Sequence, residues 1–322
     1  MRRHPHATLA VLAVITLTLV VLRIWFVGGR ASPDSDVLLW RATRCASAAA
    51  VGACLSLAGV FLQCLLRNRL ASPDLLGLAS GSAFSILLGI HLGLLPASMS
   101  NGYTLLAALI GAATSLTATF LLSRRGRVLD PVLLILTGVA IGVICSAGTM
   151  LVRHLMPLQQ TALADRMLMG SLREDVTFAQ LALAAAAALS SILAIIVLGP
   201  KLDIASFSED EARSLGAPLP MLRVVMFVGA GLLTAAAVML AGPIGFVGLI
   251  CPHIARAVCG PKHRTLALPA ALMGAALMIA ADITTRLVDL PSGRMPISIV
   301  TALVGGVSFV WVVRGQRGMV KE

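Results

Sequence analysis

Long apolar stretches, separated by short polar segments, run along the whole chain. Ten of these stretches approach the ~20 residues that a helix needs to cross the hydrocarbon core of a bilayer. The expected spans are Thr8–Val27, Thr43–Leu66, Leu75–Leu95, Tyr103–Leu122, Val132–Leu155, Phe178–Leu198, Leu222–Ala241, Ile244–Cys259, Leu266–Leu287 and Ile297–Val313. The eighth is short and rich in glycine and proline, which indicates an interrupted helix. The pattern predicts an all-α, polytopic membrane protein with a single transmembrane domain over residues 1–322.

The longest polar interruption runs from Lys201 to Arg223 and has the features of a short capped helix. Ser208 and Glu211 have the spacing of a capping box, in which each side chain satisfies a backbone N–H of the first turn. Gly216 stands where a left-handed C-cap is expected, and two prolines follow it. These signals predict a helix of about two turns over Glu209–Leu215, between the sixth and seventh spans.

Three consecutive acidic residues, Glu209 to Glu211, lie at the positive end of this short helix. A helix of this length is unstable alone in water, so it needs a surface to pack on. Ala212 and Leu215, three residues apart, form a small apolar face that would dock on a partner protein. The plainer alternative is an ordinary capped turn within a loop.

Composition and charge place the chain in a membrane. Of the 322 residues, 58% are hydrophobic and 12% are charged, about half the charged fraction of a soluble domain. The net charge of +11 does not indicate nucleic acid, because the aromatic residues that stack on bases make up only 4%. With the N-terminus inside, 16 of the 25 Lys and Arg residues fall in inner segments and 8 in outer ones. This bias predicts that both termini and the segment Lys201–Arg223 are cytoplasmic.

Reactive side chains do not form a catalytic or metal-binding pattern in the sequence. The six cysteines lie in or beside apolar stretches without a C-x-x-C pair, and the six histidines are scattered. The sequence contains neither a phosphate-binding G-x-x-x-x-G-K-[ST] motif nor a Ser/His/Asp constellation. We therefore expect a chain that binds no metal or cofactor and is not an enzyme.

Charged residues within or beside the spans are candidate functional groups. Asp282 and Arg286 stand four residues apart near the outer end of the ninth span, where a structural ion pair and a proton relay are both open. Arg41 and Arg44 share one helical face at the outer start of the second span. They indicate either snorkelling at the interface or a basic site for the carboxylates of an external partner.

Several longer stretches carry a resemblance to one family. The second span and its turn are similar to the pattern R-x-P-R … G-x-x-x-Q-x-x-x-R-N-P-L-A-x-P-x-x-L-G. It is matched by Arg41, Arg44, Gly59, Gln63, Arg67, Asn68, Leu70, Ala71, Pro73, Leu76 and Gly77. Further matches are A-R-x-L-G at 212–216, G-x-I-G-F-x-G-L-x-x-P-H-I-x-R at 242–256, A-D-x-x-x-R at 281–286 and L-P-x-G at 290–293. With these motifs nearly the whole chain resembles the FecCD family, the permease subunits of ABC importers for iron–siderophores, haem and vitamin B12.

The resemblance implies an importer built from several chains. Two permease subunits, identical or homologous, would enclose a path across the membrane, and two ATPase subunits that use ATP and Mg would dock below them. A periplasmic or lipid-anchored binding protein would deliver the substrate. This chain would lie among lipids in the cytoplasmic membrane of a bacterium. Thr43 and Arg69 replace prolines of the family pattern, and Cys251 replaces an aliphatic residue, which would alter local turn geometry.

The resemblance also implies roles for three groups of residues. The coupling helix that meets the ATPase would comprise Ser208, Glu209, Asp210, Glu211, Ala212, Arg213, Leu215 and Gly216. The docking group, Arg41, Arg44 and Arg286, would pair with acidic residues of the binding protein. The gate group, Asp130, Pro131 and Thr137, would border the path and its inner gate. The expected cargo is a ferric siderophore, with vitamin B12 and haem as alternatives. Two rivals come from other classes: an ion-coupled secondary carrier dependent on Asp282, and an integral membrane enzyme, which would need a reactive constellation in the spans that the sequence does not offer.

Overall fold

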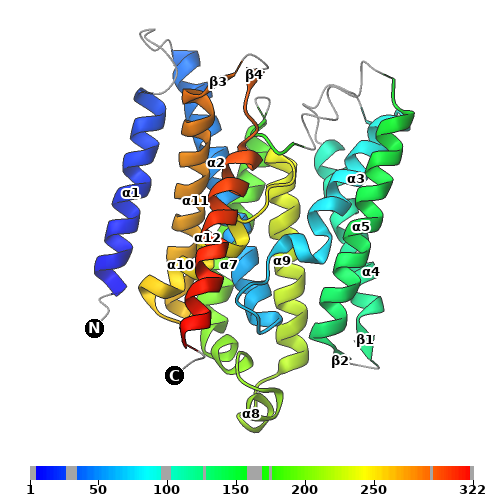
Figure 1. The fold of residues 1–322 in the computed structure, drawn as a ribbon, viewed down its shortest axis with the longest axis vertical. Helices are drawn as coiled ribbons and strands as arrows, with labels where there is room; N and C mark the ends of the chain where they lie inside the picture. The colour runs from blue at the N-terminus through cyan, green and yellow to red at the C-terminus, as the bar shows by residue number, and fades with distance from the viewer. Residues whose placement is uncertain are drawn as a thin grey trace.

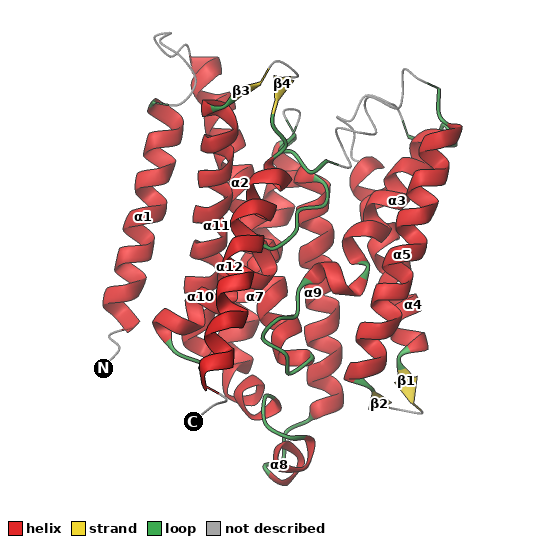
Figure 2. Cartoon of the chain, viewed as in Figure 1, coloured by secondary structure: helices red, strands yellow, loops and turns green. Residues whose placement is uncertain are grey.

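A computed structural model describes residues 5–26, 35–95, 103–125, 128–157, 169–173, 176–290 and 293–319, which are almost entirely helical (Figure 2). The helices are α1 (Pro5–Trp25), α2 (Ser35–Leu65), α3 (Leu78–His91), α4 (Tyr103–Leu122), α5 (Pro131–Leu155), α7 (Phe178–Ala205), α8 (Glu209–Ser214), α9 (Leu219–Ala241), α10 (Val247–Cys259), α11 (His263–Leu287) and α12 (Ile297–Met319). A 3-10 turn, η1 (Pro73–Leu76), precedes α3. Two short antiparallel pairs join β1 (Arg124–Arg125) to β2 (Val128–Leu129) and β3 (Asp289–Leu290) to β4 (Gly293–Arg294). The predicted all-α class is confirmed.

Each expected span coincides with a helix of the described residues. Six helices are long and apolar enough to cross a membrane: α1, α2, α5, α7, α9 and α11. Shorter apolar helices cover the remaining four expected spans, in α3, α4, α10 and α12, while the count of ten membrane crossings stays a prediction. Boundaries differ most where polar residues continue a helix, since α7 runs through Pro200 to Ala205. Figure 1 shows the long helices side by side, with both termini at the end of the bundle that carries α8.

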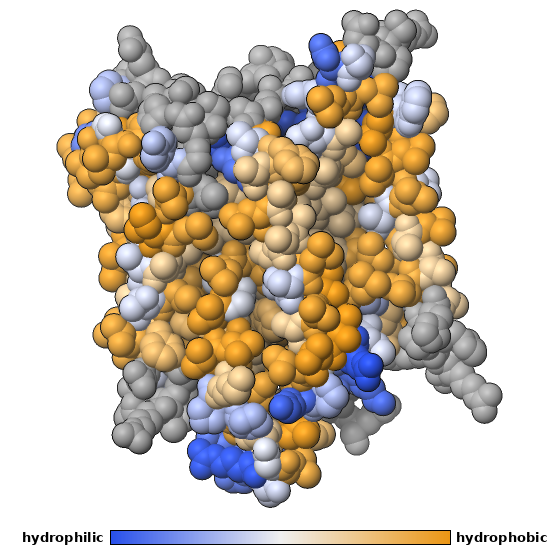
Figure 3. Space-filling model, turned by 180° about the vertical axis from the view of Figure 1, so that it is seen from behind, coloured by the Kyte–Doolittle hydropathy of each residue, from blue (hydrophilic) through white to orange (hydrophobic). Residues whose placement is uncertain are grey.

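Three helices, α2, α9 and α11, form the centre of the bundle. In their apolar windows 78%, 72% and 72% of the residues are buried, against 11% in α1 and 17% in α5. The outer helices expose large apolar side chains such as Leu17, Val143 and Leu193. Figure 3 shows hydrophobic side chains over the middle of the bundle, with hydrophilic ones mainly near its ends. This surface suits lipid rather than water.

Glycines allow the central helices to touch through their backbones. A Cβ at Gly52 of α2 would lie 2.0 Å from the carbonyl oxygen of Gly274 on α11, and one at Gly59 would lie 1.8 Å from that of Gly248 on α10. Any larger side chain would push these helices apart. Close helix packing in a membrane relies on such small residues, because lipid gives helices no hydrophobic reason to associate.

Two non-helical segments between neighbouring helices stand out in the described part of the chain, and we call them the helix interruptions. One is the turn with η1 between α2 and α3, and the other is the non-helical segment 242–246 between α9 and α10. The expected eighth span begins at Ile244 within this segment, but α10 continues through Pro252 without a break, so the interruption lies before the helix rather than inside it. A Cβ built on Gly245 of this segment would lie 3.4 Å from Oδ2 of Asp74 on η1, so the two interruptions are in contact. Figure 1 shows the segment that joins α2 to α3 within the height of the bundle rather than beyond its end.

Candidate functional site

A buried carboxylate at one end of the bundle collects arginines from three helices. Asp282 of α11 is fully buried and accepts from Nε of Arg23 on α1 at 2.5 Å and from Nε of Arg44 on α2 at 2.9 Å. Arg286, one turn along α11, lies farther away, with its Nε 3.9 Å from the carboxylate. The sequence predicted Arg286 as the partner of Asp282, whereas the closer contacts come from the other two helices.

The predicted docking group is mostly buried, and two of its members, Arg44 and Arg286, lie against this carboxylate. Arg41 donates from Nη1 to the carbonyl oxygen of Ile24 at 3.0 Å, and Arg44 donates from Nη1 to that of Leu172 at 3.2 Å. Arg286 stacks on the ring of Trp40, with 4.7 Å between its Cζ and the ring centroid. Arg41 and Arg44 are 4% and 7% exposed. These guanidiniums are therefore held inside the chain rather than extended into solvent, and their docking role stays a prediction.

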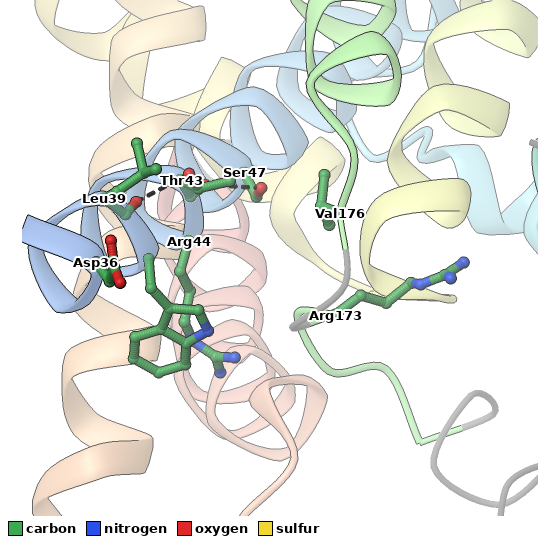
Figure 4. Close-up of a pocket in the computed structure, with 8 residues that line it drawn as sticks. Asp36, Leu39, Thr43, Arg44, Ser47, Arg173 and Val176 are labelled. Atoms are coloured by element: carbon green, nitrogen blue, oxygen red, sulfur yellow. Dashed lines mark hydrogen bonds between the residues drawn. The ribbon is translucent and has the colours of Figure 1, made fainter. Parts of the chain in front are cut away.

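A pocket of ≈ 310 Å³ opens beside Arg44. Its lining consists of Asp36, Leu39, Trp40, Thr43, Arg44, Ser47, Arg173 and Val176. Figure 4 shows α2 along one side and the segment with Arg173 and Val176 on the other, with the Arg173 side chain extending away from α2. Arg44 thus contacts both the buried carboxylate and an open pocket, which gives an external carboxylate a way to approach it.

At the other end, α8 has the predicted capping box. The backbone N–H of Ser208 donates to Oε2 of Glu211 at 3.0 Å, and the N–H of Glu211 donates to Oγ of Ser208 at 3.4 Å. Gly216 adopts the left-handed conformation, with φ of 73°. The helix covers Glu209–Ser214, one residue shorter than expected. Local sequence signals therefore predicted this element well.

The predicted docking face of α8 comprised Ala212 and Leu215, and the prediction is wrong for Ala212. Ala212 is fully buried inside the chain, on a helix that contacts α7, whereas Leu215 is 59% exposed. The helix turns Ala212 inward because burying it anchors α8, which is too short to be stable alone. Leu215, Asp210 and Arg213 remain on the exposed side.

An ion pair fixes α8 to the next helix. Glu209 accepts from Nη2 of Arg213 at 2.7 Å and from Nη2 of Arg223 on α9 at 3.0 Å. Arg223 is buried, and its hydrogen bond is the main reason why the pKa of Glu209 lies below its ordinary value. The hydrogen bond from Ser208 likewise lowers the pKa of Glu211. Both carboxylates therefore keep their charge to a lower pH than an ordinary glutamate, and Glu209 ties α8 to α9.

The three residues of the gate group lie at the start of α5. Asp130 is the N-cap of this helix and accepts from the backbone N–H of Val132 at 2.9 Å, and Pro131 takes the first helical position. The Thr137 hydroxyl lies 2.6 Å from that of Ser123 on the segment before it. These contacts fix where α5 begins, while the gating role stays a prediction.

Sequence reasoning missed Arg23, which is fully buried like Asp282. It lies within the first expected span, and its partner Asp282 is 259 residues away, beyond the reach of local patterns. A signal existed, since a charge inside an apolar span is costly and requires a partner or access to the interface.

A bundle with an apolar belt, interrupted helices and a capped helix beyond one end has the architecture of a membrane transport protein. Residues 6–315 match the FecCD transport family. The vitamin B12 import system permease protein BtuC of Klebsiella pneumoniae is 34% identical over 318 residues, covering 97% of this chain and 93% of that protein. The hemin transport system permease protein HmuU of Yersinia pestis is 33% identical over 278 residues, covering 86% and 82%.

Two solved structures have a similar fold. An inward-facing conformation of a metal-chelate type ABC transporter matches with a TM-score of 0.85 and 29% identity, over 96% of this chain and 99% of that one. PsaBC from Streptococcus pneumoniae, at 14% identity over 84% of this chain and 90% of that one, has a TM-score of 0.55 and shares the fold. The chain therefore belongs to the FecCD transport family and is a membrane-spanning permease of a bacterial ABC importer.

Proposed function

We propose that the chain is one of two permease subunits that carry a metal chelate, with a ferric siderophore as the first candidate, across the cytoplasmic membrane. Two separate ATPase subunits, using ATP and Mg, drive transport, and a binding protein delivers the cargo. The chain crosses the membrane ten times as a single domain, with both termini and α8 in the cytoplasm, and binds no cofactor itself. The likeness to a metal-chelate type transporter supports this proposal.

The geometry of α8 carries the proposal. This helix projects beyond the ends of the spanning helices (Figure 1), and Glu209 ties it to Arg223 of α9. A helix that is fixed to the bundle and exposes Leu215 can receive force from a docked ATPase and pass it to a central helix. Residues Ser208–Gly216 act as this coupling element, with Ala212 as its internal anchor.

The opposite end receives the binding protein. Acidic side chains of that partner approach Arg44 through the pocket beside it, while Arg41 and Arg286 add positive charge. Such contacts steer association and weaken with salt. Near the end that carries α8, Asp130, Pro131 and Thr137 position the start of α5 at the inner gate.

Co-purification tests the proposal directly. The chain should isolate with an ATPase subunit, and the binding protein should stimulate ATP hydrolysis by the complex. Arg41→Gln with Arg44→Gln, which removes the positive charge without placing a second carboxylate beside Asp282, should weaken docking of the binding protein and leave ATPase assembly intact. Transport by the purified chain alone on an ion gradient would refute the proposal. Asp282, which such a carrier would need, is already engaged by Arg23 and Arg44.

A second candidate cargo is vitamin B12 or haem. The relatives named for vitamin B12 and hemin transport favour it, because they match over most of this chain. Titration of the cognate binding protein with a ferric siderophore, vitamin B12 and haem would decide between them, and tight binding of either of the latter two would replace the siderophore.

A further inference from the structure

Asp74 lies where the two helix interruptions meet. It belongs to η1, which contacts α2, α3, α5 and α9. Its side chain is exposed, whereas the neighbouring residues Ser72, Pro73 and Leu76 are buried. Because helices of the bundle surround η1, the exposed carboxylate faces an internal space rather than lipid.

The second interruption forms the opposite wall of this space. The backbone N–H of Phe246 donates to the Asp74 carboxylate. Among the described residues, a Cβ built on Gly245 would meet one atom within 4 Å, Oδ2 of Asp74, at 3.4 Å. There is therefore room beside the carboxylate of Asp74, which already accepts one hydrogen bond from the backbone.

Two further helices close in on the junction. A Cβ at Gly77 would lie 2.7 Å from the backbone nitrogen of Gly142 on α5. A Cβ at Gly305 of α12 would lie 2.3 Å from Cβ of Phe246. Segments from both halves of the chain thus converge around Asp74, as at the central sites that discontinuous helices form in other transporters.

Physical chemistry limits what this junction can be. Non-helical backbone at membrane depth is stable only where protein covers it or where it lines a water-filled cavity. An ionisable side chain at that depth is costly and marks a route for ions or substrates. An exposed carboxylate beside open space between two backbone breaks fits the water-filled case.

We propose that Asp74 lines the transport route at this junction and there binds a cationic group of the cargo. The proposal rests on the proposed function and narrows its substrate class. A negative charge on the route attracts a chelate with an ammonium group and repels an anionic one. Three hydroxamates balance the charge of a ferric ion, whereas three catecholates exceed it, so the cargo is a neutral or cationic chelate of the hydroxamate kind.

The first test measures the electrostatic potential at the junction in the purified full-length chain. It needs no transport, so it does not depend on the proposed function. Gly245→Cys places a thiol beside Asp74, and its rates with a cationic and an anionic methanethiosulfonate are compared. We expect both reagents to react and the cationic one to be faster. Asp74→Asn should lower the ratio of the two rates roughly tenfold, as expected for a unit charge a few ångströms away. Because both reagents react with the same thiolate, the ratio of the two rates does not depend on the ionised fraction of the thiol.

Two controls bracket this measurement. The parental chain, with its six native cysteines, gives the background rate. Asp74→Glu in the Gly245→Cys chain keeps the charge and should keep the rate ratio. A Gly245→Cys chain that reacts no faster than the parent, or a ratio unchanged by Asp74→Asn, overturns the placement of Asp74 on the route.

The second test measures uptake by the assembled transporter in proteoliposomes. The probes are a ferric trihydroxamate with an ammonium tail and a ferric tricatecholate. We expect preferential uptake of the first, a severalfold weaker preference with Asp74→Asn, and a retained preference with Asp74→Glu. Better uptake of the catecholate, uptake of neither probe, or equal effects of both variants overturns the cargo assignment. Stimulation of ATP hydrolysis by the binding protein reports separately on the proposed function.

Discussion

Replacing Arg23 with methionine removes the guanidinium that contacts Asp282 at 2.5 Å and keeps an unbranched apolar side chain. Both residues are fully buried. Breaking a buried ion pair from one side costs about 3–5 kcal/mol when the remaining charge is left uncompensated. Asp282 keeps Arg44 at 2.9 Å, so we expect a smaller loss of about 2–3 kcal/mol.

Unfolding of the purified chain in detergent measures this loss. Five of the six cysteines are buried, so a thiol-reactive dye reports unfolding as they become accessible. Arg213→Met is the matched control, because it removes an exposed arginine from an ion pair within α8. Exposed pairs of this kind contribute little to stability, so the control should unfold close to the parent.

A double-mutant cycle separates the ion pair from simple packing. Asp282→Asn is combined with Arg23→Met, and the double variant should be less destabilised than the sum of the single variants, by about 1–3 kcal/mol. Additive losses, or an Arg23→Met chain as stable as Arg213→Met, would refute the inference that this contact holds α1 to α11.

Three further predictions concern α8 and helix packing. Ala212→Asp puts a charge in a fully buried site and should abolish ATPase binding or coupling with the spans still folded. Unchanged ATPase co-purification together with unchanged ATP-driven transport would contradict this. Gly52→Ala should destabilise the bundle by roughly 1–3 kcal/mol, because its Cβ would meet the backbone of α11, whereas Gly306→Ala, which has open space, should be neutral in the same unfolding assay. The hydrogen bond from Arg223 lowers the pKa of Glu209 below its ordinary value of 4.5, so the ion pair stabilises α8 above that pH and is lost as the pH falls through the lowered pKa. Proteolysis around α8 should therefore increase at low pH in the parent chain, whereas the Glu209→Gln chain should show no such pH dependence.

Local signals predicted the fold because they act within a few residues. The apolar stretches gave the helices, since a membrane leaves the backbone no other partner than itself. Ser208, Glu211 and Gly216 gave both ends of α8 by capping chemistry. Helix ends were less accurate where local signals suggest a break that the fold does not make, since α7 continues through Pro200 to Ala205.

Long-range contacts could not be predicted from the sequence, for a physical reason. The spacing of Asp282 and Arg286 predicted a pair within one helix, but the bundle brings Arg23 and Arg44 closer to that carboxylate. Likewise, periodicity placed Ala212 on the surface with Leu215, whereas the fold turns it inward. Which face of a helix is covered depends on its neighbours, and a single sequence does not contain their positions.

The contact between Arg23 and Asp282 also has a consequence for biosynthesis. The arginine is made 259 residues before its carboxylate, so at ~5–20 residues per second the ribosome takes roughly 10–50 s to supply the partner. During that time α1 carries a guanidinium near its end while α11 does not yet exist. Arg23 must then stay at the membrane interface, and α1 takes its final place only when α11 is inserted. Although α1 is made long before α11, it is thus among the last helices to be locked in position.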